Sequence, residues 1–174
     1  MECSPKPRKN QIRLLEAYAK LKADIGDTFP LVFGGGEGWQ LENFDDVICD
    51  LGLEQNVVKL GYVNDVQLRW LYRHCYALVY PSIFEGFGLP ILEAMSQGAA
   101  VITSNVTSMP EVIGDAGILV NPFDINEIFI GMKKIYTGEM DRIEMKKMAF
   151  ERSKEFSWEN TARQVLNVYD RMIG

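Results

Sequence analysis

Two glutamates bracket a glycine-rich turn near the middle of the chain. The segment EGFGLPILE runs from Glu85 to Glu93 and carries Gly86 and Gly88 between them. Glycine permits positive φ angles and a close approach of the backbone to a ligand, and a helix that begins after the turn offers free N–H groups and a positive dipole end. Such a turn holds a phosphate without a cationic side chain.

The two carboxylates require a different ligand group, because a negative side chain repels phosphate. An ionised glutamate accepts hydrogen bonds on two oxygens, which suits the paired hydroxyls of a sugar. With Glu85 before the turn and Glu93 about one turn into the helix, the acids flank a diphosphate, one toward a ribose and one toward a sugar. The alternative is structural: a glutamate in a first helical turn stabilises the dipole by about 0.3–1 kcal/mol, and such turns also occur where nothing binds.

Short apolar runs alternate with helical patterns along the chain, which is typical of a Rossmann-like parallel α/β sheet flanked by helices. The glycine turn follows one run and precedes a helix predicted at 90–97, so it lies at the carboxyl end of a parallel strand, where such sheets generally bind ligands. The runs are nearly continuous, as expected for strands covered on both faces. They span residues 31–36, 57–63, 76–82, 99–104 and 117–122.

Start signals predict the helices between these strands. Asn10 is placed to cap one helix, and Asn64 with Gln67 has the spacing of a capping box. Pro90 and Pro110 each fit the first residue of a helix. Further helices are predicted over 126–136 and 140–156, with a last one after Ser157-Trp158-Glu159.

Size and composition limit the class of protein. The 174 residues, 47% of them hydrophobic, suffice for one core, so we expect a single domain over residues 1–174. A formal charge of −6 argues against a nucleic-acid partner. The absence of an apolar run of about 20 residues and of a signal sequence predicts a cytoplasmic protein without a transmembrane segment. The three cysteines form no disulfide or zinc pattern.

Two further features have structural interpretations that we favour over functional ones. The only histidine, His74, lies late in an amphipathic segment and receives no catalytic role. The basic residues between Lys133 and Lys154 alternate with acidic ones, which favours a solvated helix face over peripheral docking on a membrane.

The segment EGFGLPILEAMSQGAAV, residues 85–101, resembles the signature of the retaining, nucleotide-sugar-dependent glycosyltransferases of family 4, also called group 1, which have the GT-B fold. That signature has two glutamates separated by seven residues, commonly as EGFGLPxLEAMAxGxPV. Other segments match the family in its order along the chain. They are PRKN (7–10), VFGGGEG (32–38), VKLGYVNDVQLRWLY (58–72), YPS (80–82), SNVTSMPEVIGDAGILVNP (104–122) and FSWENTA (156–162).

The resemblance implies roles for the matching positions. Glu85 contacts the donor sugar and orders the reacting end, and Glu93 binds the nucleotide ribose. Lys9 is the cation on the diphosphate, with a solvated charge as its structural alternative. Val63 lies against the base, with strand core as its alternative. The main-chain N–H groups offered to the diphosphate belong to Gly86, Phe87, Gly88 and Leu89.

The resemblance also implies the reaction. The expected activity is a hexosyltransferase of polysaccharide biosynthesis that transfers sugar, with retention, from a UDP- or GDP-sugar to a glycan or lipid-linked acceptor, without a further cofactor. Lys9 and the helix end, rather than a divalent metal, stabilise the leaving diphosphate. In this family the unit is the C-terminal GT-B half, so the expected partner is an N-terminal acceptor domain, absent from this chain. Ala99-Ala100 departs from the family's usual small residue followed by proline.

Two other functions stay open. The segment GGGEG after a strand is a feature of NAD-dependent Rossmann enzymes, although Gly34, Gly36 and Trp39 break the G-x-G-x-x-G spacing and the loop follows a helix. A non-catalytic nucleotide-binding or scaffolding domain is the other alternative, for a unit that acts without an acceptor domain.

Overall fold

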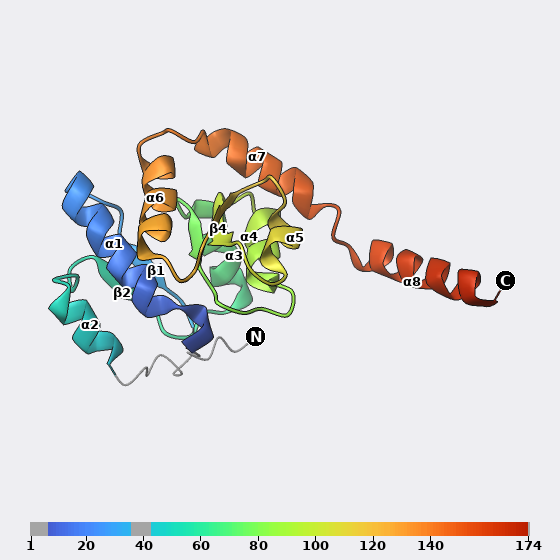
Figure 1. The fold of residues 1–174 in the computed structure, drawn as a ribbon, viewed down its shortest axis with the longest axis horizontal. Helices are drawn as coiled ribbons and strands as arrows, with labels where there is room; N and C mark the ends of the chain where they lie inside the picture. Colours follow the sequence, from blue (N-terminus) through green and yellow to red (C-terminus); the bar gives the residue numbers. More distant parts are fainter. Residues whose placement is uncertain (1–6, 36–42, 174) are drawn as a thin grey trace.

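The strands of the computed structural model, which describes residues 7–35 and 43–173, all pair in parallel. β1 (Leu31–Phe33) pairs with β2 (Val57–Lys59), and β4 (Val101–Ser104) lies between β3 (Leu78–Tyr80) and β5 (Ile118–Val120). The predicted class, a parallel α/β fold flanked by helices, is confirmed (Figure 1). Backbone pairing divides these strands into a set of two and a set of three rather than one continuous ladder.

Each predicted apolar run contains one strand, but the strands are three or four residues long. The run at 76–82 illustrates the difference. Its last two residues, Pro81 and Ser82, are buried although they lie beyond the end of β3. Burial therefore continues into the loop after the strand, which is why hydrophobicity alone overestimated the length of the strand.

Two hydrophobic clusters form the core, one on each face of β4. Val101 belongs to a cluster with α3, α4, α5 and α7, whereas its neighbour Ile102 belongs to a cluster with α1, α2, α6 and also Met145 of α7. Successive side chains of a strand point to opposite faces, so β4 is covered on both sides. The first set of helices is α3 (Asp65–His74), α4 (Leu89–Ser96), α5 (Met109–Ile113) and α7 (Arg142–Ser153); the second is α1 (Gln11–Ile25), α2 (Phe44–Asp50) and α6 (Ile125–Tyr136).

Helix ends confirm some sequence predictions and correct others. The Asn64 capping box is present, with the side chain accepting from the Gln67 N–H at 3.0 Å and the Gln67 amide oxygen accepting from the Asn64 N–H at 2.9 Å. Pro90 and Pro110 are second rather than first residues, because α4 and α5 begin one position earlier. The predicted side-chain cap by Asn10 is wrong: it precedes α1 but makes no capping bond.

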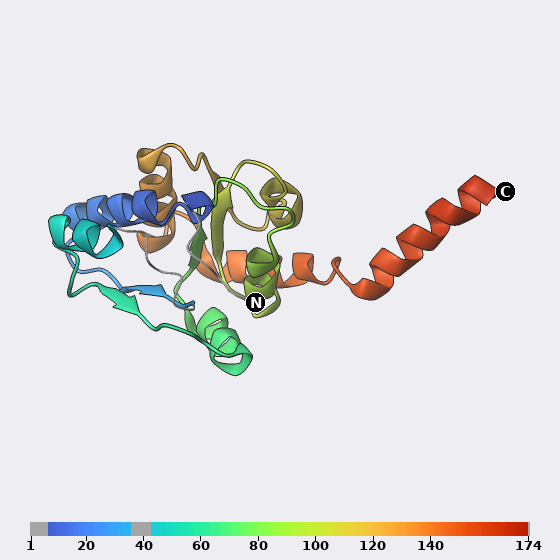
Figure 2. The ribbon, with the colours of Figure 1, turned by 90° about the horizontal axis from the view of Figure 1, so that it is seen from below.

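The remaining helices follow the same pattern. The bounds of α6 and α7 differ from the predicted segments by at most three residues, and the ends of helices are the least reliable part of such a prediction. α2 was not predicted, because its seven residues bury only Phe44 and Ile48, too few to show a helical period. α8 (Trp158–Ile173) extends away from the rest of the molecule (Figures 1 and 2). None of the described helices combines the length and the hydrophobicity needed to cross a bilayer.

Candidate functional site

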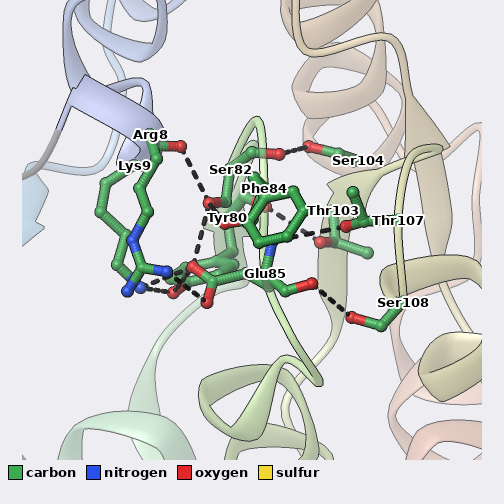
Figure 3. A network of polar contacts seen from close by, with 10 residues as sticks. All are labelled: Arg8, Lys9, Tyr80, Ser82, Phe84, Glu85, Thr103, Ser104, Thr107 and Ser108. Carbon is green, nitrogen blue, oxygen red and sulfur yellow. Dashed lines mark hydrogen bonds and ion pairs between the residues drawn. The ribbon is translucent and has the colours of Figure 1, made fainter.

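A buried carboxylate lies at the carboxyl end of β3. Glu85 is 8% exposed, and its Oε1 atom accepts hydrogen bonds from the Lys9 ammonium at 2.7 Å and the Tyr80 hydroxyl at 2.8 Å (Figure 3). The Ser82 hydroxyl lies 3.0 Å from the same oxygen. The Lys9 ammonium also contacts the Tyr80 hydroxyl, so these side chains form one network. A charge buried this deeply requires such partners.

The second oxygen of Glu85 is less occupied. Its Oε2 atom lies 3.7 Å from the Arg8 guanidinium, beyond ordinary hydrogen-bond length. The Lys9 side chain is only 10% exposed and the Arg8 side chain 39% exposed. The alternative interpretation of Lys9 as a solvated charge is therefore wrong. Oε2 is the oxygen of Glu85 with acceptor capacity left for a ligand hydroxyl.

The start of α1 is held against the segment that carries Glu85. The Arg8 carbonyl accepts from the Ile83 N–H at 2.7 Å. Asn10 is buried, with a left-handed φ of 60°, and its side-chain amide donates to the carbonyls of Pro81 at 2.9 Å and Pro122 at 2.5 Å. The Asn10 side chain therefore joins the start of α1 to the loops at Pro81 and Pro122 instead of capping its helix.

The glycine turn takes the shape that its sequence predicted. Gly88 has a φ of 96° and directly precedes α4, the helix that begins at Leu89. A Cβ atom at Gly88 would lie 3.2 Å from the Cδ1 atom of Ile91, which is fully buried. Gly86, Phe87 and Leu89 are exposed, so the turn faces solvent with the amino end of α4 behind it.

We expect Gly88→Ala to lower the free energy of unfolding by about 1–2 kcal/mol, the cost of a left-handed conformation in a residue with a side chain. The close approach to Ile91 adds to that cost. Urea denaturation of the two proteins measures the difference. Gly86→Ala is the matched control, because no atom lies within 4 Å of a Cβ at that position. Equal losses for the two variants would contradict this account of the turn.

Glu93 lies in α4, half-buried, where the Tyr72 hydroxyl donates to its Oε2 atom at 3.4 Å. Burial raises the pKa of Glu93, and the hydrogen bond from Tyr72 opposes that rise. Glu93 is the fifth residue of α4, beyond the first turn, where the dipole effect has faded. The helix dipole therefore does not explain this residue.

Val63 lies in the loop between β2 and α3. It is half-buried, and a Cβ added to Gly34 would lie 3.3 Å from its Cγ2 atom, so Val63 packs on the backbone just after β1. The interpretation of Val63 as strand core is wrong, because β2 ends at Lys59. Val63 occupies the carboxyl-end side of β1 and β2.

The predicted site residues lie in segments that follow the carboxyl ends of the parallel strands or lead into α1 and α4. Lys9 and Glu85 are in contact, and the turn from Gly86 to Leu89 leads directly to the helix that carries Glu93. Val63 precedes the Asn64 cap of α3, the helix whose Tyr72 contacts Glu93. Most of the GGGEG segment lies outside the described residues, so its place relative to the site is not described.

Sequence reasoning missed several residues of this network. Arg8 and Ser82 stood in matched motifs, PRKN and YPS, yet received no role. Thr107 and Ser108 contact the main chain of Glu85 although more than 20 positions separate them from it. No local pattern reveals such pairs. The one sequence signal is the run of hydroxyl residues at 103–108, which begins at the carboxyl end of β4 and continues into the loop after it.

Comparison with known proteins identifies related sequences. The family model "Glycosyl transferases group 1" matches residues 5–152. The O-antigen chain mannosyltransferase B of Escherichia coli is 42% identical over 167 residues, which are 94% of this chain and 43% of that protein. The chain therefore spans less than half the length of this relative.

Solved structures show the same fold. Sucrose-phosphate synthase from Thermosynechococcus elongatus superposes with a TM-score of 0.82 at 25% identity, over 97% of this chain and 43% of that one. The C-terminal domain of a glycosyl transferase group 1 family protein from Francisella tularensis superposes with a TM-score of 0.75 at 24% identity, over 87% of this chain and 80% of that one.

Proposed function

The chain belongs to the group 1 glycosyltransferases, with the fold of the C-terminal half of GT-B enzymes, and we propose that it binds a nucleotide-diphosphate sugar and transfers the sugar with retention. The observation that carries this proposal is the buried Lys9–Glu85 pair beside the glycine turn and the amino end of α4. Cations and N–H groups suit the diphosphate of such a donor, and a carboxylate suits the hydroxyls of its sugar.

In this proposal the diphosphate lies against the cationic side chains and the N–H groups of the site. An ammonium has three N–H groups, and two of those on Lys9 bond to Glu85 and Tyr80, which leaves the third for a phosphate oxygen. Arg8 adds a second, partly exposed cation. The N–H groups from Gly86 to Leu89 complete the cradle. Charge developing on the leaving diphosphate is stabilised by groups already in position, a large catalytic term in many enzymes.

The two acids bind the ends of the donor. Glu85 uses its less occupied Oε2 atom to accept from hydroxyls of the sugar, while Oε1 keeps its internal donors. Glu93 accepts from the ribose diol, and Val63 lies against the base. Retention is proposed from the resemblance of the signature, with Glu85 as a binding and orienting group and not as an assigned nucleophile.

The sugar and the partner domain are inferred from relatives. A mannosyltransferase with 42% identity supports a hexose, with mannose as the first choice. We propose that the acceptor, a glycan or lipid-linked sugar, is bound mainly by an N-terminal domain. The relative has length for such a domain, because this chain matches only 43% of it. The chain by itself then binds donor and transfers little.

Titration calorimetry with GDP, UDP and NAD tests the proposed binding. We expect heat of binding with GDP or UDP and none with NAD. Binding of NAD without either nucleoside diphosphate would favour the Rossmann dehydrogenase interpretation instead. If the chain binds nucleotide but gives no transfer when joined to the part of its Escherichia coli relative that this chain does not match, a non-catalytic binding domain becomes the better interpretation.

We expect the affinity for the nucleoside diphosphate to fall as the solution is acidified. The fall should begin at a higher pH than it would if Glu93 had the pKa of an ordinary glutamate. Burial raises the pKa of Glu93 in the free protein, and only its ionised form accepts two hydrogen bonds from a diol. Affinity is therefore full above the raised pKa and is lost as the pH falls through it. Calorimetry between about pH 4 and about pH 8 measures the profile.

Glu93→Gln is the control for this pH profile, because the phosphates titrate in both proteins but the carboxylate only in the parent. The difference between the two profiles reports Glu93 alone. Identical profiles would remove Glu93 from the ribose site.

A further inference from the structure

Two residues other than glycine have positive φ angles within residues 7–35 and 43–173: Asn10 at 60° and Thr107 at 55°. Asparagine tolerates this conformation, but a β-branched threonine there is a true outlier. Both residues contact the segment between β3 and α4, Asn10 through the Pro81 carbonyl and Thr107 through the Glu85 N–H. The unusual conformations are thus confined to the surroundings of one loop.

Thr107 belongs to a segment that holds the main chain of Glu85 from both sides. The Glu85 N–H donates to the Thr107 Oγ1 atom at 3.4 Å, and the Ser108 hydroxyl donates to the Glu85 carbonyl at 3.1 Å (Figure 3). Earlier in the same segment, the hydroxyls of Thr103 and Ser104 donate to the carbonyls of Tyr80 at 2.9 Å and Ser82 at 2.6 Å. Four hydroxyls between residues 103 and 108 thereby contact the backbone that runs from β3 to Glu85.

Packing does not require the conformation of Thr107, because this residue is exposed. Strained backbone of this kind persists only where surrounding contacts determine it, and it gathers at functional sites. This conformation places the Thr107 hydroxyl beside the Glu85 N–H, just before the glycine turn.

We propose that Thr107 is a positioning residue: together with Ser108 it clamps the peptide groups of Glu85 and so fixes the direction of the N–H groups from Gly86 to Leu89. The proposal rests on the proposed function, because those N–H groups are the ones offered to the diphosphate of the donor. Thr107 acts through Glu85 and the turn and touches no substrate itself.

Three substitutions separate the hydroxyl from the backbone strain. Thr107→Val keeps the branched shape and removes the hydroxyl, Thr107→Ser keeps the hydroxyl, and Thr107→Gly removes both the strain and the hydroxyl. We expect the Val and Gly variants to bind GDP or UDP about three- to tenfold more weakly, the range for one lost hydrogen bond, and Thr107→Ser to bind as the parent does. Asn105→Gly, at an exposed position in the same loop, is the control for flexibility and should leave affinity unchanged.

A second measurement needs no ligand. Hydrogen exchange at the Glu85 amide should accelerate in the Val and Gly variants and remain at the parent rate in Thr107→Ser. The melting temperature of Thr107→Gly should equal or exceed that of the parent, because strain is removed while binding weakens. A merely structural residue would instead lower the melting temperature and leave the affinity of the folded protein unchanged.

The outcomes distinguish the clamp from the function on which it rests. If the parent binds neither nucleoside diphosphate, the proposed function fails, while the exchange of the Glu85 amide still tests the clamp. If the parent binds and Thr107→Val binds equally well with an unchanged Glu85 amide, the clamp is overturned and the function stands.

Discussion

Glu85→Ala is expected to lower the free energy of unfolding by about 3–5 kcal/mol, the scale for removing one partner of a buried ion pair. The Lys9 side chain is 10% exposed, so the variant would leave its ammonium without its carboxylate partner in a site that largely excludes water. The hydroxyls of Tyr80 and Ser82 would lose their acceptor at the same time. Urea denaturation monitored by circular dichroism measures the loss.

Two further variants give this prediction its control and its internal check. Asp45→Ala breaks an exposed pair with Lys59, where the side chains are 73% and 44% exposed, and should cost less than about 1 kcal/mol. Replacing both members of the buried pair, as Lys9→Met with Glu85→Leu, should be less destabilising than Glu85→Ala alone, because no uncompensated charge remains. Unfolding midpoints that coincide for Glu85→Ala and the parent would show that the pair is not buried in solution.

Glu93→Ala is expected to weaken the binding of the nucleoside diphosphate by about 1–3 kcal/mol, roughly a five- to 150-fold loss of affinity. The physical reason is the loss of charge-assisted hydrogen bonds between the carboxylate and the ribose diol. Titration calorimetry with GDP or UDP measures the change. Glu144→Ala, which removes an exposed acid of α7, is the matched control and should bind as the parent does.

The stability of the Glu93→Ala variant separates a binding role from a structural one. Burial raises the pKa of this carboxyl in the folded protein, so ionisation at neutral pH costs the folded state more than the unfolded state. Removal of the carboxylate removes that cost, and the variant should be as stable as the parent or more stable. Parent-like affinity combined with reduced stability would assign Glu93 to the fold alone.

The order of strands and helices could be read from local patterns. Apolar runs located all five strands seen in the described residues, and the spacing of Asn64 and Gln67 located a capping box, because these features depend on neighbours along the chain. The glycine turn was placed at the end of β3 for the same reason. Pro81 and Ser82 are buried although they lie beyond the last paired residue of β3, so the apolar pattern overestimated the length of that strand.

The sequence by itself therefore determined the α/β class, the glycine turn before α4 and, through the motif from Glu85 to Val101, the family. Only the tertiary structure decided how the site is assembled. Lys9 and Glu85 lie 76 positions apart, Asn10 bonds to loops instead of capping its helix, and Thr107 takes a conformation that its residue type disfavours. The physical reason is that periodicity and turn preference act over a few residues, whereas a buried charge takes its partners from whichever segments the fold brings to it.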